Sequence, residues 1–165
     1  MASWKRCKGN VDPFKRLNEE ILDPLRFHEL QTKNQELLEI ASPVMQKLYR
    51  IVQGSGFVIV LYAVNSLNIF LLRFLGDPET FSLLEWVNAI PGSNWAENIM
   101  GTHAASLSVI LNKPFQVRPY ENWCEAQHRG TTSAAPIHDP ETGEIIGCLD
   151  MGGLLIKFIR ILWEL

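Results

Sequence analysis

The sequence predicts a mixed α/β (α+β) domain, with a central antiparallel sheet of five to six strands and helices on both faces. Three observations lead to this prediction. The stretch 57–75 is almost continuously apolar but carries polar residues at its centre, as two buried strands joined by a turn would. A second strand–turn–strand pattern covers 131–151. Segments with helical spacing precede, separate and follow these two hairpins.

Residues 1–28 are expected to form an N-terminal lead-in, with a short helix over about 14–22. A long signalling helix should follow over 29–53. Its apolar residues alternate at spacings of four and three, which is typical of a heptad seam: Leu37, Ala41, Val44, Leu48 and Ile51. Pro43 should kink or split this helix, because proline lacks an amide donor and crowds the preceding turn.

The apolar stretch 57–75 is about as long as a membrane span. However, Asn65, Ser66 and Asn68 fall near its middle, where polar groups would be expensive in a bilayer. A buried hairpin with its turn at these residues is therefore favoured over a transmembrane helix.

Two helices and a short strand are expected between the hairpins. Asp77-Pro78 is a typical helix start, with aspartate as N-cap and proline at the first position, and the helix should reach about residue 89. A second helix is expected over about 101–111, followed by a short strand over 115–119 and a loop over 120–130.

The stretch "QHRGTTSAAPIHDPETGEIIGCLDMGG" (127–153) holds histidines, aspartates and a cysteine, which raises the question of a catalytic or metal centre. Asp139-Pro140-Glu141-Thr142-Gly143 has the composition of a tight turn: proline presets φ, aspartate bonds its own backbone, and glycine accepts positive φ. His138 and Asp139 are therefore interpreted as residues of a hairpin turn.

The terminal segment 154–165 is expected to be a helix with one narrow polar stripe, formed by Lys157, Arg160 and Glu164. A surface helix needs only one apolar stripe, so this helix should be covered nearly all round. Together with the seam on 29–53, it predicts a homodimer formed through the terminal helices.

Composition narrows the class of protein. A length of 165 residues indicates one domain, here 29–165 after the lead-in. The net charge of −3 argues against direct nucleic-acid binding. Three scattered cysteines favour a reducing, cytoplasmic setting over a disulfide framework. The N-terminus lacks the apolar run of a signal peptide.

No nucleotide-binding glycine motif or nucleophile elbow occurs, and His128 and His138 lack a third ligand at metal-binding spacing, so neither cofactor nor metal is expected. Two loop-rich segments instead combine aromatic side chains with histidine and arginine, as a small-molecule pocket would. The candidate ligand-binding residues are Trp95, His103, Trp123, Cys124, His128 and Arg129. Alternatively, the two tryptophans plug an open edge of the sheet.

Several segments resemble the N-terminal GAF sensory region of bacterial sigma-54-dependent activators of the acetoin/glycerol-catabolism type: "SWKRC", "GSGFVIVL", "LGDPE", "GSNWAENIMGT" and "NWCEAQHRGTTSAAPIHDPETGEIIGCLDMGG". The resemblance covers about residues 3–153. It implies a GAF fold, effector sensing, and a downstream ATPase domain and helix-turn-helix in the full-length protein. On this basis the chain is expected to be a fragment of a regulator or a stand-alone remnant.

The chain departs from that family at presumed pocket positions. The family's GTNAIGTAL is here Gly101-Thr102-His103-Ala104-Ala105-Ser106-Leu107-Ser108-Val109, and HxWTCSAAP begins His128-Arg129-Gly130-Thr131-Thr132-Ser133. A different effector, or a degenerate site, would follow from these changes.

The sequence thus favours a non-enzymatic, small-molecule-sensing regulatory domain, with two alternatives. One is a redox sensor or GAF-type reductase using Cys124, whose nearest base is His128; we expect near-normal reactivity for this thiol. The other is a ligand-free dimerisation module. A cavity beside Trp95 and Trp123 would favour the sensor, and a lowered thiol pKa would favour the reductase.

Overall fold

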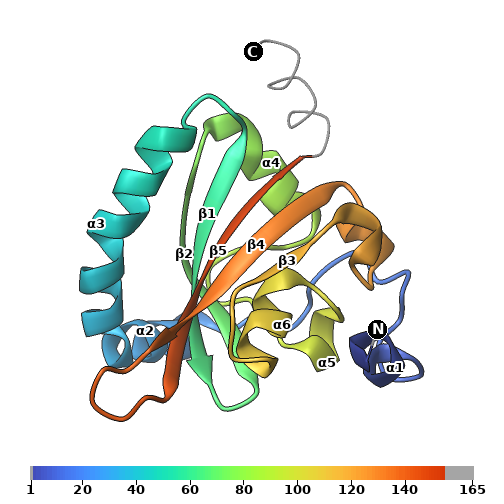
Figure 1. The fold of residues 1–165 in the computed structure, drawn as a ribbon, viewed down its shortest axis with the longest axis horizontal. Helices are drawn as coiled ribbons and strands as arrows, with labels where there is room; N and C mark the ends of the chain where they lie inside the picture. The colour runs from blue at the N-terminus through green and yellow to red at the C-terminus, as the bar shows by residue number, and fades with distance from the viewer. Residues whose placement is uncertain (1, 155–165) are drawn as a thin grey trace.

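The computed structural model describes residues 2–154, so the terminal helix expected over 154–165 remains a prediction. Five strands form one sheet in the order β2-β1-β5-β4-β3, and all neighbours pair antiparallel (Figure 1). This confirms the predicted sheet and both hairpins. The strands are β1 (Phe57–Asn65), β2 (Asn68–Gly76), β3 (Phe115–Val117), β4 (Gly130–His138) and β5 (Ile145–Leu154).

Helices cover both faces of this sheet, as predicted (Figure 1). α3 packs on one face, while α4, α5 and α6 lie on the other and α1 packs beyond them. The helices are α1 (Ala2–Cys7), α2 (Pro24–Lys33), α3 (Gln35–Val52), α4 (Pro78–Trp86), α5 (Glu97–Met100) and α6 (Ala104–Ile110), with short 3-10 turns η1 (Pro119–Glu121) and η2 (Glu125–Gln127).

The two faces of β1 explain why its sequence is almost wholly apolar. Successive side chains of a strand point to opposite faces. Ile59 and Leu61 pack against α3, whereas Val60 and Tyr62 join the core beneath α6. The stretch 57–75 is the β1–β2 hairpin, and none of the described helices combines the length and hydropathy that a membrane span requires.

The helix predicted over 14–22 was wrong. This segment has no helix, and the first helix, α1, lies nearer the N-terminus. This segment bonds to a distant loop instead. The side-chain amide of Asn18 donates to the carbonyl of Asn94 at 2.7 Å, and the backbone amide of Asn94 donates to the Glu20 carbonyl at 2.8 Å. These tertiary bonds override the local helical pattern.

The predicted helix 29–53 is divided, but not at proline. It breaks at Asn34, whose side-chain amide donates to the Leu30 carbonyl at 2.8 Å, and α3 then runs on through Pro43. The heptad seam must also be corrected. Leu37 and Ala41 are buried against the chain's own sheet, so a partner chain cannot contact them. The exposed apolar residues of α3 are Ile40, Val44 and Ile51.

Asp77 occupies the predicted N-cap position of α4, but its carboxylate does not cap that helix. It accepts hydrogen bonds from the amides of Gly54 and Gly56, at 2.9 and 3.3 Å, and from the hydroxyl of Tyr49 at 3.0 Å. The carboxylate therefore ties the end of α3 to the start of α4.

The 139–143 turn forms as predicted. The carboxylate of Asp139 accepts hydrogen bonds from the amides of Glu141 and Thr142 at 2.8 and 2.9 Å, and Gly143 has φ +73°. These bonds hold the pKa of the Asp139 carboxyl below its ordinary value. This aspartate serves the hairpin turn.

Candidate functional site: a cavity between the sheet and α4

A cavity of about 390 Å³ lies on the sheet face that carries α4 and α6. Its volume falls within the range of small-molecule pockets. Apolar atoms make up most of the lining surface, and the larger apolar and aromatic residues are Val58, Val60, Tyr62, Leu84, Trp86, Val87, Ala89 and Trp95. Within residues 2–154, eight polar or charged residues also line this space: Thr80, Ser82, His103, Asn122, Gln127, Arg129, Thr132 and Asp150.

Asp150 is the most unusual group in this lining. It sits on the central strand β5, opposite Val60 of β1 and Ala134 of β4, and is only 5% exposed. One carboxylate oxygen, Oδ1, has no hydrogen-bond partner. Burial raises the pKa of this carboxyl to about 7, against the opposing effect of a hydrogen bond from the Met151 amide.

Thr132 on β4 also lines the cavity, and its Oγ1 is buried without a partner. Neither Thr132 nor Asp150 was among the ligand-binding residues predicted from sequence. A signal for Asp150 was present, since a carboxylate in the middle of a buried strand is rarely tolerated without a partner.

His103 is held rigidly at the start of α6. Its Nε2 lies 2.5 Å from the carbonyl oxygen of Trp95, and the two rings meet edge to face with centroids 5.5 Å apart. Burial lowers the pKa of His103 to about 4, so the ring is neutral near pH 7. Trp95 is fixed in turn, because its indole N–H donates to the Ser93 hydroxyl at 2.8 Å.

Arg129 lies just before β4, and its guanidinium carbon is 5.4 Å from the ring centroid of Trp86 on α4. This cation–π contact joins two sides of the cavity. Trp86 is 53% exposed, which places the contact where the cavity opens to solvent.

Trp123 does not line the cavity. It packs against Gly101, which has φ +72° and where an added Cβ would lie 2.6 Å from the tryptophan Cβ, so this close approach requires glycine. Its indole N–H donates to the Val11 carbonyl at 2.8 Å, and its ring meets Trp4 edge to face. Trp123 therefore fastens the N-terminal segment to the domain.

Cys124 and His128 also lie outside the cavity lining, and they do not bond to each other. The Cys124 thiol donates to the Met100 carbonyl at 3.3 Å, and burial raises its pKa to about 11. The His128 ring instead contacts the Asn122 carbonyl at 3.1 Å. The raised pKa indicates a thiol less reactive than the near-normal one expected, which disfavours nucleophilic chemistry at Cys124.

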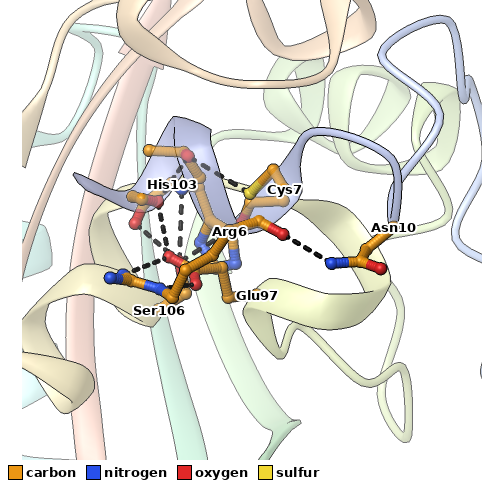
Figure 2. A network of polar contacts seen from close by, with 9 residues as sticks. Arg6, Cys7, Asn10, Glu97, His103 and Ser106 are labelled. Atoms are coloured by element: carbon orange, nitrogen blue, oxygen red, sulfur yellow. Dashed lines mark hydrogen bonds and ion pairs between the residues drawn. The ribbon is translucent and has the colours of Figure 1, made fainter. Parts of the chain in front are cut away.

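A polar network connects α1 to the start of α6, next to the cavity (Figure 2). Glu97 pairs with Arg6, with Nε–Oε2 and Nη2–Oε1 distances of 2.6 and 2.9 Å. The Ser3 hydroxyl bonds both Glu97 and Thr102, which adjoins His103. Burial alone would raise the pKa of Glu97, but these hydrogen bonds hold it below its ordinary value. Over residues 2–154, no group of His, Cys, Asp and Glu side chains is arranged to hold a metal ion.

Several known proteins are similar in sequence to this chain. The signal-transduction and transcriptional-control protein of Clostridium beijerinckii is 31% identical over 157 residues, covering 92% of this chain and 23% of that protein. The acetoin dehydrogenase operon transcriptional activator AcoR of Bacillus subtilis is 26% identical over 150 residues, covering 90% of this chain and 24% of AcoR. The chain is a homologue of the N-terminal regions of acetoin- and glycerol-operon transcriptional activators. No protein-family model matches it.

This activator homologue spans only about a quarter of the length of these relatives. Its fold agrees with a solved structure, the DhaR(N)–DhaL complex of Escherichia coli, with a TM-score of 0.88 and 17% identity over 94% of this chain and 52% of that one. The five-stranded antiparallel sheet flanked by helices is GAF-like, as the resemblance implied.

Proposed function

We propose that this chain is the small-molecule-sensing, regulatory region of a bacterial transcriptional activator and that the cavity is its effector site. The observation that carries the proposal is a mostly apolar cavity containing buried polar atoms without partners. Native proteins rarely leave such atoms unpaired, and a bound molecule would supply the missing hydrogen bonds. Trp95, His103 and Arg129 would contact the effector, together with Asp150 and Thr132.

Effector binding would act by shifting the population between two packings of the domain, which requires different affinities for the two. The cavity touches α4 through Leu84 and Trp86, and the start of α6 through His103. The Ser3–Thr102 contact extends this connection to α1. The signal would continue through the terminal helices to an ATPase domain of the full-length protein. Three buried free thiols agree with a reducing cytoplasm as the setting.

The proposal can be tested by protein-observed NMR on the 165-residue chain with acetoin, glycerol and small aromatic alcohols. A true effector should shift amides lining the cavity, and at 100 times its dissociation constant it should add about 2.7 kcal/mol of stability. Ala89→Phe, which places a ring in the cavity, should abolish binding. Ile51→Phe on the exposed side of α3 is the matched control and should leave it intact. Equal binding by both variants would place the effector elsewhere.

Homodimerisation through the terminal helices is part of the same proposal, supported by the exposed apolar side chains of Ile40, Val44 and Ile51. A dimerisation module without a ligand is the alternative function that this surface supports. Light scattering of the unmodified chain and of Val44→Glu tests whether this surface forms a dimer. A stable monomer at tens of micromolar concentration, well above an ordinary dimer dissociation constant of about a micromolar or less, would exclude the dimer.

A further inference from the structure

Two unpartnered polar atoms of the cavity are neighbours on the sheet. Thr132 of β4 pairs with Gly152 of β5, and Asp150 lies two residues before that glycine, so the two side chains are diagonal neighbours on one face. Both line the cavity, and both Thr132 Oγ1 and Asp150 Oδ1 lack partners. Diagonal neighbours lie roughly 7 Å apart or less at Cβ, so one ligand group between them can reach both.

The chemistry of this pair restricts what can bind. An ionised carboxylate only accepts hydrogen bonds, while a threonine hydroxyl both donates and accepts. Within residues 2–154, no lysine, arginine or histidine forms an ion pair with Asp150. Arg129 contacts the Trp86 ring, and His103 contacts the Trp95 carbonyl. A ligand must therefore bring its own donor to Asp150, and an anionic group there would meet a like charge without a counterion.

The rest of the lining sets the ligand's other properties. Tyr62, Trp95 and the aliphatic side chains of β1 and α4 offer apolar surface, and the cavity holds only a compact molecule. On the basis of the proposed function, we infer that the effector is a compact, non-acidic, mainly apolar molecule bearing one O–H or N–H donor. Asp150 and Thr132 bind this donor.

Four probes of nearly the same size test the inference on the 165-residue chain: benzyl alcohol, benzylamine, toluene and benzoate. Binding is measured by NMR titration at pH 8, where Asp150 is ionised. The other titratable groups near it are Tyr62, Cys148, His103 and Arg129. Of the groups in this set whose pKa is shifted, Asp150 alone has a pKa near 7. The alcohol or the amine should bind roughly ten-fold or more tightly than toluene, because a hydrogen bond to a charged group is worth about that factor. Benzoate should bind most weakly.

Preference for the alcohol would identify a neutral hydroxyl as the donor, and preference for the amine an ammonium group. Asp150→Asn and Thr132→Val should each remove most of the advantage over toluene. Thr131→Val is the matched control, because Thr131 neighbours Thr132 but does not line the cavity. Circular dichroism checks that each variant is folded. If Asp150→Asn does not fold, Thr132→Val still tests the inference.

Toluene binding as tightly as the alcohol and amine would overturn the inference and leave the sensor proposal standing. The same holds if Asp150→Asn and Thr132→Val both leave the affinities unchanged. A cavity that takes none of the four probes would count against both the inference and the sensor proposal.

Discussion

Replacing Asp150 by asparagine should stabilise the empty domain, although the residue lies in the middle of the sheet. The ionised carboxylate is buried and lacks a counter-charge among residues 2–154, so folding carries the penalty of desolvating it. Asparagine has nearly the same shape and carries no charge. The fold should therefore tolerate the change and lose that penalty.

The magnitude follows from the Asp150 pKa of about 7 in the folded chain and an ordinary value of 3.8. Each pKa unit corresponds to 1.36 kcal/mol, so the penalty reaches about 4 kcal/mol at pH 8. Because the pKa is raised on folding, the folded chain binds this proton more tightly than the unfolded chain does. Stability contributed by this group is complete below pH 3.8 and is lost as pH rises through 7. A bound effector that pairs with the carboxylate would offset the loss.

Urea denaturation of the wild type and Asp150→Asn at pH 5 and pH 8 measures the effect. The variant's gain in unfolding free energy should be larger at pH 8 than at pH 5 by about 1–3 kcal/mol, since most of the titration falls between these values. Other titrating groups, including His103, contribute equally to both proteins and cancel in the difference. A gain that does not change with pH, or a destabilised variant at pH 8, would refute the reasoning.

Three further predictions concern the groups around the cavity. Glu97→Gln should lower the unfolding free energy by about 1–3 kcal/mol, because it removes the charge from the Arg6 pair; urea titration tests this, and the exposed Glu79→Gln should change little. The His103 ring takes up a proton when the wild-type chain unfolds in acid, which should cost the wild type about 3 kcal/mol of unfolding free energy between pH 6.5 and pH 4. His103→Gln should remove this loss; acid titrations of the two proteins that superimpose would contradict the prediction. Cys124, with a pKa of about 11, should react with iodoacetamide at pH 8 only as fast as the chain opens; a rapid first-order phase in the native protein would restore the redox alternative.

The parts of the fold that local sequence determines were predicted well. The apolar run with a polar centre became β1–β2, and the Asp139 turn formed the β4–β5 hairpin, because periodicity and turn chemistry act over a few residues. The helix expected over 14–22 failed because Asn18 bonds to Asn94, a contact that no local pattern reports.

The candidate site was predicted less completely for the same reason. Trp95, His103 and Arg129 do line the cavity, as a set of aromatic and basic residues in loops suggested. Trp123 and Cys124 are close to Arg129 in the chain, but their contacts are to the N-terminal segment and to Met100. Asp150 becomes part of the site only when β5 is inserted between β1 and β4.

That insertion has a consequence for how the chain is made on the ribosome. β1 and β2 are synthesised early, yet the strand that covers the free edge of β1 is β5, the last strand of residues 2–154. Translation at about 5–20 residues per second leaves this hairpin waiting on the order of seconds, with an open edge and apolar side chains on both faces. The nascent chain is then most prone to aggregate, and chaperone demand should peak before residue 145 emerges. Slowing translation between β2 and β5 should lower the yield of folded protein more than slowing it upstream of β1.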